Sequence, residues 1–194
     1  LGCSTTDKQE TTADFDQLTD DYLQVFWGLS PGWASWAGLS QYDSVLVVPT
    51  PSYLEEVKST TDSLLVVLNS YPEETLEDLD KIDLNMMKDM LNSAIWSMTE
   101  FMSREWDPSE TNIAFRVGMI MNRPDSMDIK LKTLNALLTN APEFYRVRLA
   151  NVKTPSKPHL DLAILQNQGT LNYLSSLEGT VESAEISSDQ KEEL

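Results

Sequence analysis

The stretch DLNMMKDMLNSAIWSMTEFMSREW, residues 83–106, decides the fold class of this chain. Its apolar residues recur at alternating spacings of three and four positions, which places them along one side of a helix. These positions are Leu84, Met87, Leu91, Ala94, Met98 and Phe101. So narrow an apolar seam is typical of a helix that packs between near-parallel neighbours. The sequence therefore predicts a long central helix, and its buried residues are expected to include Met87, Leu91, Met98 and Phe101.

The segments on both sides of this stretch are also predicted to be helical. Ser30-Pro31 and Thr50-Pro51 each combine an N-cap residue with proline at the first helical position, which is how many helices begin. Apolar spacing predicts helices over residues 14–27, 31–39, 51–71, 126–138 and 142–152, and from residue 158 onward. Only residues 44–48 alternate as a strand would. The prediction is an all-α fold, an irregular multi-helix bundle of about six to eight helices.

Composition divides the chain into three segments. Residues 1–13 contain too few apolar side chains to pack, which predicts a flexible, lipidated tether. Residues 14–182 are predicted to form the helical domain. Residues 183–194 are acidic and polar, and they are expected to be a linker or a terminus.

The only cysteine, Cys3, lies in the N-terminal sequence LGCS. Without a second cysteine, a disulfide would have to be intermolecular. A reactive thiol would need a cationic neighbour, and the only histidine, His159, is distant in the sequence. The third interpretation, which we favour over an unmodified thiol, is lipid attachment, because these residues resemble the end of a bacterial lipobox. We therefore expect Cys3 to anchor an outer membrane lipoprotein that faces the periplasm, with Ser4 resembling an outer-membrane sorting residue.

The chain carries a net charge of −17, from 31 acidic and 14 basic residues. Such an acidic chain is a poor partner for nucleic acid, which binds proteins through phosphate neutralisation. Residues 111–160 are the exception, with eight basic and three acidic residues. We interpret this asymmetry as charge that pairs across the fold or faces solvent, in preference to a dedicated anion-binding patch.

No catalytic constellation is recognisable. One histidine and one cysteine exclude a zinc site built on those side chains within this chain, and no clustered glycines form a phosphate loop. The acid-rich stretch at residues 72–89 lacks the glycine and the final glutamate of a calcium loop. His159 follows Pro158 at a predicted helix start, where a structural role is expected. The sequence therefore predicts no catalytic residue, no metal ligand and no cofactor in this stretch.

The most informative local feature is the aromatic cluster YLQVFWGLSPGWASWAGL, residues 22–39. Tryptophan buries a large area but needs a partner for its N–H, so it is often found at the rim of a core or a groove. The interpretation we favour is that these rings hold the first helices on the bundle. The functional alternative is that Trp27, Trp33 and Trp36 form one wall of a substrate cleft.

Two segments carry a resemblance to a known family. PGWASWAGLSQYDSVL, residues 31–46, has proline, alanine, glycine and Tyr-Asp at characteristic positions, and YRVRLANVKTPSKPHLDLAILQNQGTLNYL, residues 145–174, has an Ala-Ile-x-Gln-x-x-Gly helix after a proline turn. Together they resemble the bacterial family catalogued as domain of unknown function 885, over about residues 20 to 178. The resemblance implies an envelope lipoprotein that looks like a zinc metallopeptidase.

The family's His-Glu-x-x-His helix lies in its C-terminal part and has no counterpart here, so no zinc ligand is carried over. Two functions follow. The chain is either the non-catalytic helical part of a peptidase-like lipoprotein, whose C-terminal catalytic part is its partner and holds any zinc, or a self-contained helical lipoprotein that binds a partner or ligand.

Overall fold

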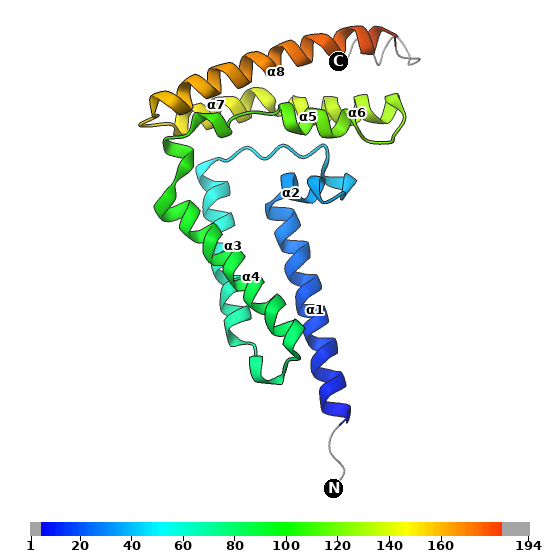
Figure 1. The fold of residues 1–194 in the computed structure, drawn as a ribbon, viewed down its shortest axis with the longest axis vertical. Coiled ribbons are helices and arrows are strands. Elements are labelled where there is room, and N and C mark those ends of the chain that lie inside the picture. The colour runs from blue at the N-terminus through cyan, green and yellow to red at the C-terminus, as the bar shows by residue number, and fades with distance from the viewer. Residues whose placement is uncertain (1–4, 184–194) are drawn as a thin grey trace. The chain divides into compact units, whose positions relative to one another are not determined.

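The computed structural model describes residues 5–183, and within them it contains helices and connecting turns but no strand (Figure 1). The prediction of an all-α, multi-helix fold is confirmed. Every helix among the described residues is too short or too polar to span a lipid bilayer. The chain divides into two compact units. We call residues 1–29 with 51–102 the three-helix unit, and residues 30–50 with 103–194 the pocket unit.

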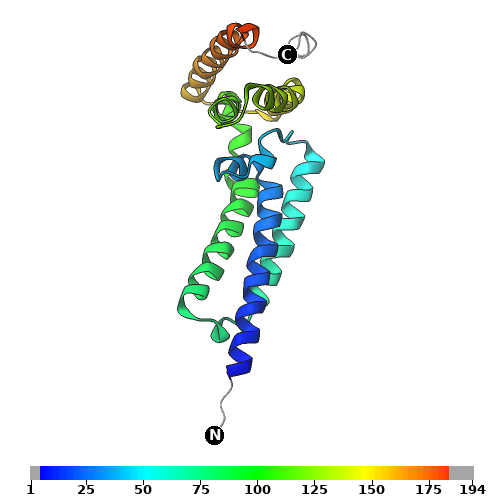
Figure 2. The same cartoon turned by 90° about the vertical axis from the view of Figure 1, so that its right-hand side faces the viewer.

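In the three-helix unit, α1 (Thr5–Leu29), α3 (Pro51–Ser70) and α4 (Asp78–Trp96) run side by side (Figures 1 and 2). A short 3-10 turn, η2 (Glu73–Thr75), precedes α4. Residues of all three helices, with Leu76 from the connection between η2 and α4, make the core of this unit. They are Phe15, Tyr22, Leu68, Leu76, Leu84, Met87 and Leu91. The predicted burial of Met87 and Leu91 is confirmed, with 6% and 4% of their surface exposed. Removing this apolar area from water is what holds the three helices together.

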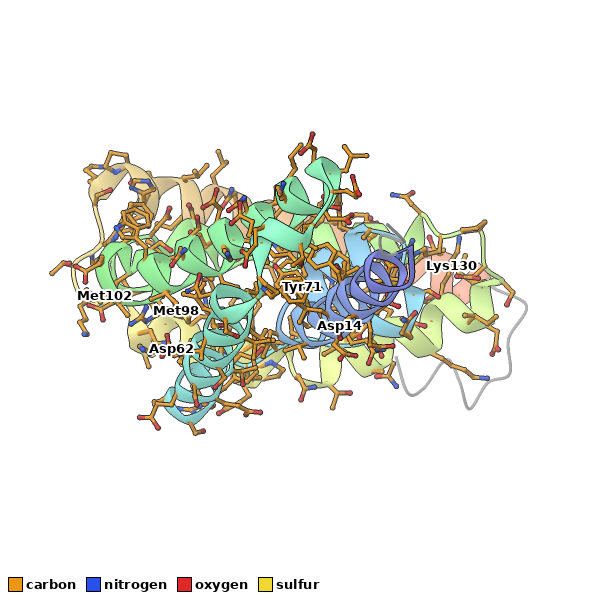
Figure 3. The ribbon with its side chains drawn as sticks, turned by 90° about the horizontal axis from the view of Figure 1, so that it is seen from below. Asp14, Asp62, Tyr71, Met98, Met102 and Lys130 are labelled. Atoms are coloured by element: carbon orange, nitrogen blue, oxygen red, sulfur yellow. The ribbon has the colours of Figure 1, made fainter. Side chains whose placement is uncertain are left out.

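The end of α4 differs from the prediction of one helix over residues 83–106. The α-helix stops at Trp96, a π-helical turn η3 (Ser97–Phe101) follows, and Met102 adopts a left-handed φ of 46° at the end of this segment (Figure 3). The Met102 N–H bonds Ser97 O at 3.0 Å, five residues back. A π turn changes the direction in which the next side chains point. The predicted burial of Phe101 is therefore wrong: it is 43% exposed and stacks on Trp96. Met98 of the same turn, also predicted to be buried, is only partly buried.

Tyr71, just after α3, closes one end of this unit. Its side chain lies beside Asp14 of α1 (Figure 3), and its ring contacts that of Phe15 at 5.4 Å between centroids. Burial raises the pKa of the Tyr71 hydroxyl, and the charges of Asp14 and Asp80 raise it further. The hydroxyl is therefore neutral at physiological pH.

The pocket unit contains the remaining helices. They are α2 (Pro31–Trp36), α5 (Ala114–Met121), α6 (Met127–Thr139), α7 (Ala141–Asn151) and α8 (Lys157–Ser183), with the 3-10 turns η1 (Ser40–Tyr42), η4 (Ser103–Glu105) and η5 (Pro108–Glu110). The core of this unit is an aliphatic cluster made of Leu46, Ile113, Val117, Ile120, Leu134 and Leu137. Tyr173, Leu174 and Leu177 place one side of α8 against it.

Most predicted helices occur near their predicted positions. α2 begins at Pro31 and α3 at Pro51, as expected from the proline signals. Residues 44–48, where apolar residues alternate, form no strand, in keeping with the all-α prediction. The prediction missed α5, because its eight residues show less than three turns of periodicity. α1 begins at Thr5 and not at Asp14. Cys3 and residues 184–194 lie outside the described residues.

Candidate functional site

The short helix α2 exposes two tryptophans. Trp33 and Trp36 are 62% and 64% exposed, and their rings meet edge to face with 5.7 Å between centroids. The opposite side of α2 is buried, with Ala34 and Ser35 fully covered. Because the opposite side of the helix is buried, α2 presents both indoles at the surface.

A third ring completes an aromatic pocket. Phe115 of α5 is 62% exposed, and with Gly32, Trp33, Trp36 and Arg116 it lines an open pocket of about 500 Å³. A Cβ added at Gly32 would lie 3.5 Å from Nη1 of Arg116, so the guanidinium lies directly behind the glycine. Ligand pockets in proteins usually measure roughly 300–1,000 Å³ and are mostly apolar with a few polar groups. This pocket has that composition: three aromatic rings and one cation.

A buried ion pair beneath the pocket ties α2 to the segment that follows α5. Asp43 is 3% exposed and accepts hydrogen bonds from Arg123 Nε at Oδ2 and from Nη2 at Oδ1, both at 2.8 Å. The Ser35 hydroxyl also donates to Asp43, and Arg123 Nη2 donates to the Ser35 carbonyl at 2.7 Å. Such bidentate arginine–carboxylate pairs fix geometry as well as charge. This network therefore sets the position of the helix that presents both indoles.

Arg116 is held differently. Its Nη2 donates to the carbonyls of Tyr42 and Asp43 at 2.9 and 3.1 Å, and its Nε is buried with no hydrogen-bond partner among the described residues. Burial lowers the pKa of Arg116, against the opposing effect of the Asp43 charge. For Asp43, burial raises the pKa, but hydrogen bonds from Arg123 and Ser35 and the charges of both arginines outweigh it, so the pKa is lowered. The Asp43 carboxylate and the Arg116 and Arg123 guanidinium groups are all charged at neutral pH.

The structure separates the predicted aromatic wall. Trp33 and Trp36 lie together in the pocket, whereas Trp27 belongs to α1 of the three-helix unit and packs edge to face on Phe26 at 5.0 Å. The sequence interpretation missed Phe115 and Arg116, because the helix that carries them was not predicted. The excess of basic residues in 111–160 was the one available signal for Arg116.

His159 lies between Ser156 and Asp107, which gives a Ser–His–Asp arrangement. Its Nδ1 is 2.5 Å from Ser156 Oγ, and its Nε2 is 3.6 Å from Asp107 Oδ2. Ser156 immediately precedes α8, so the first contact joins the N-cap and N3 positions of one helix. The second distance exceeds a hydrogen bond, and the other oxygen of Asp107, Oδ1, accepts from Ser109 N at 2.9 Å. We assign the Ser156–His159 contact to capping the start of α8.

Metal-ligating side chains and a second hollow are the other features that could form a site. Among the side chains that the structure describes, no three or more of His, Cys, Asp or Glu gather as a metal ion would require. A second hollow of about 450 Å³ lies between α6 and α8 and is lined by leucines of both helices, including Leu134, Leu138 and Leu171, with Glu178 and Glu182. It has no exposed aromatic ring and no arginine. The aromatic pocket is therefore the better candidate site.

Comparison with solved structures gives one informative relative. A protein from Shewanella oneidensis, described as "a putative lipoprotein of unknown function", is 28% identical and superposes with a TM-score of 0.87 over 92% of this chain. The match covers 33% of that protein, so this chain spans about a third of its length. No protein-family model matches the chain, and no curated protein matches it. The comparisons thus support similarity to a lipoprotein, and they add nothing to the metallopeptidase part of the resemblance.

Proposed function

We propose that this chain is the helical, non-catalytic binding part of a lipid-anchored protein of the cell envelope, and that its pocket between α2 and α5 binds a ligand with an apolar body. The observation that carries this proposal is three exposed aromatic rings around a pocket of about 500 Å³. Aromatic side chains contribute large contact areas with little loss of conformational freedom, so clusters of them at a surface favour binding. The buried Asp43–Arg123 pair supports it further, because it holds the helix that carries two of the rings before a ligand arrives.

The anchor in this proposal is Cys3, through acyl chains on the thiol and the amine. The similarity to a Shewanella lipoprotein supports an envelope location. The finer location is the outer membrane, with the two helical units on the periplasmic side. Several acyl chains would anchor the chain firmly, whereas one chain gives only marginal membrane binding.

A second candidate follows from the length of the Shewanella protein, of which this chain matches a third. In a longer protein of that kind, the aromatic pocket would form one wall of a substrate cleft. The other wall and any zinc would then belong to a C-terminal catalytic part, as the family resemblance implies. The chain's own role is the same in both candidates, because Trp33, Trp36 and Phe115 contact the bound molecule.

The test is a titration of the purified chain with Nile red, a neutral dye that becomes fluorescent in apolar surroundings. Replacing both pocket indoles, Trp33→Ala with Trp36→Ala, is expected to weaken binding at least about tenfold, which corresponds to about 1.4 kcal/mol. Trp96→Ala is the matched control, because Trp96 is similarly exposed, at 52%, but lies in the three-helix unit. Circular dichroism checks that all variants are folded. Equal binding by the double variant and the control would contradict the proposal.

A further inference from the structure

We propose that the pocket is specific for an anionic ligand, an apolar or aromatic body that carries a carboxylate, and that Arg116 is the residue that selects it. This inference rests on the proposed function and names its ligand class. It follows from the balance of charge beneath the pocket and from the direction in which the Arg116 guanidinium is held.

The charge of Arg116 has no carboxylate of its own. Both oxygens of Asp43 accept hydrogen bonds from Arg123, and Oδ1 also accepts from Ser35. Arg116 is bound only through two backbone carbonyls, and no acidic oxygen lies within ion-pair distance of it in the described residues. Arg123 therefore takes both carboxylate oxygens of Asp43, and the Asp43 charge acts on Arg116 only through space, without a direct ion pair. A partly buried cation with no directly bonded anion is stabilised when a ligand supplies one.

The orientation of Arg116 leaves one nitrogen for the ligand. Nη2 is occupied by the carbonyls of Tyr42 and Asp43, and Nε is fully buried. Nη1 lies next to Gly32, which lines the pocket and has no side chain to cover it. Because two carbonyls fix the planar guanidinium, Nη1 is presented to the pocket without further ordering of the side chain. A carboxylate that accepts from Nη1 places the attached apolar body against Trp33, Trp36 and Phe115.

The same charge argues against a cationic ligand. Three aromatic rings by themselves would attract a quaternary ammonium group through their π faces. Here the guanidinium lines the same pocket and would repel a second cation at close range. A neutral apolar ligand would bind to the rings but would leave the arginine without a directly bonded anion. The anionic compound is the class that satisfies both features of the pocket.

The experiment compares three probes that share one aromatic body: 1-naphthylacetate, the neutral 1-naphthylacetamide and 1-naphthylmethylammonium. Isothermal titration calorimetry of the wild-type chain is expected to show the carboxylate binding at least tenfold more tightly than the amide, and the ammonium more weakly than either. In Arg116→Gln, verified as folded by circular dichroism, the ratio of carboxylate to amide affinity should fall to near one. Ratios are compared within each variant, so a modest loss of stability does not affect the conclusion.

The outcomes separate this inference from the function on which it rests. Equal or tighter binding of the amide or the ammonium overturns the carboxylate selectivity, and the binding function stands if Nile red still depends on Trp33 and Trp36. A preference for the carboxylate that survives in Arg116→Gln overturns the role of Arg116. Failure of all three probes, together with Nile red binding that ignores the two indoles, overturns both proposals.

Discussion

Replacing Asp43 with alanine should be among the most destabilising single changes in the pocket unit. Asp43 is 3% exposed, and its carboxylate joins two parts of that unit, because it accepts from Arg123, after α5, and from Ser35 of α2. Asp43→Ala removes the acceptor and leaves the Arg123 guanidinium without its partner. The effect comes mainly from that orphaned charge and not from the lost packing of a small side chain.

The magnitude follows from the burial of the two partners. Breaking a buried ion pair by removing one member costs about 3–5 kcal/mol. The Arg123 side chain is 21% exposed, against 4% for Asp43, so the arginine keeps some contact with water after its partner is lost. We therefore expect the lower end of that range, about 3 kcal/mol. Asp161→Ala is the control, since Asp161 pairs with Lys157 at the surface of α8, and such pairs contribute about 0–1 kcal/mol.

The same carboxylate makes the unit sensitive to acid. The folded-state pKa of Asp43 is lowered, so its stabilisation is fully present above the ordinary value of 3.8 and is lost as the pH falls through the folded value. The wild-type unit should therefore lose this contribution on acidification below the ordinary value. In Asp43→Asn the contribution is absent at every pH, so the stability difference between wild type and variant should shrink as the pH falls.

Hydrogen exchange followed by mass spectrometry is the suitable assay, because it reports on each unit separately. Tryptophans occur in both units, so fluorescence would mix their signals. Peptides from residues 30–50 and 114–124 should exchange much faster in Asp43→Ala, whereas peptides from α4 should change little. If Asp43→Ala and Asp161→Ala gave the same protection, the network would not stabilise α2 and the reasoning would be refuted.

Three other expectations can be checked independently. Cys3→Ala should release the precursor from the membrane fraction or leave its signal uncleaved; unchanged fractionation, with no acyl mass on the N-terminal peptide, would rule out lipidation. Leu91→Asp should destabilise the three-helix unit by more than about 4 kcal/mol, because Leu91 is 4% exposed, whereas Phe101→Ala should change the free energy of unfolding by less than about 1 kcal/mol. The chain should neither hydrolyse a peptide library nor retain one zinc after dialysis, and His159→Ala should weaken only the start of α8. Turnover that His159→Ala abolishes would show that the Ser156–His159–Asp107 cluster is catalytic.

What the sequence determined by itself is the local, helical part of the structure. Helical hydrogen bonds join residues four positions apart, so apolar spacing and proline signals within a short window predicted the all-α class, the starts at Pro31 and Pro51 and the burial of Met87 and Leu91. The same reasoning failed at the end of α4. There the Met102 N–H donates to the carbonyl of Ser97, five residues back, and Phe101 is exposed to solvent. A spacing pattern carries no information on such a bond.

The tertiary structure alone decided the site. Asp43 and Arg123 are 80 positions apart, and Tyr42 and Arg116 are 74 apart, so no sequence window contains both members of either contact. Among 31 acidic and 14 basic residues, nothing local distinguishes a buried pair from solvated charge. The roles of the residues in the motif at 31–46 are visible only in the fold. Ala34 and Ser35 are buried, Gly38 takes a φ of 99°, and Asp43 forms the ion pair with Arg123. The opposite sides of α2 and α5 are buried, so Trp33, Trp36 and Phe115 lie at the surface around Arg116.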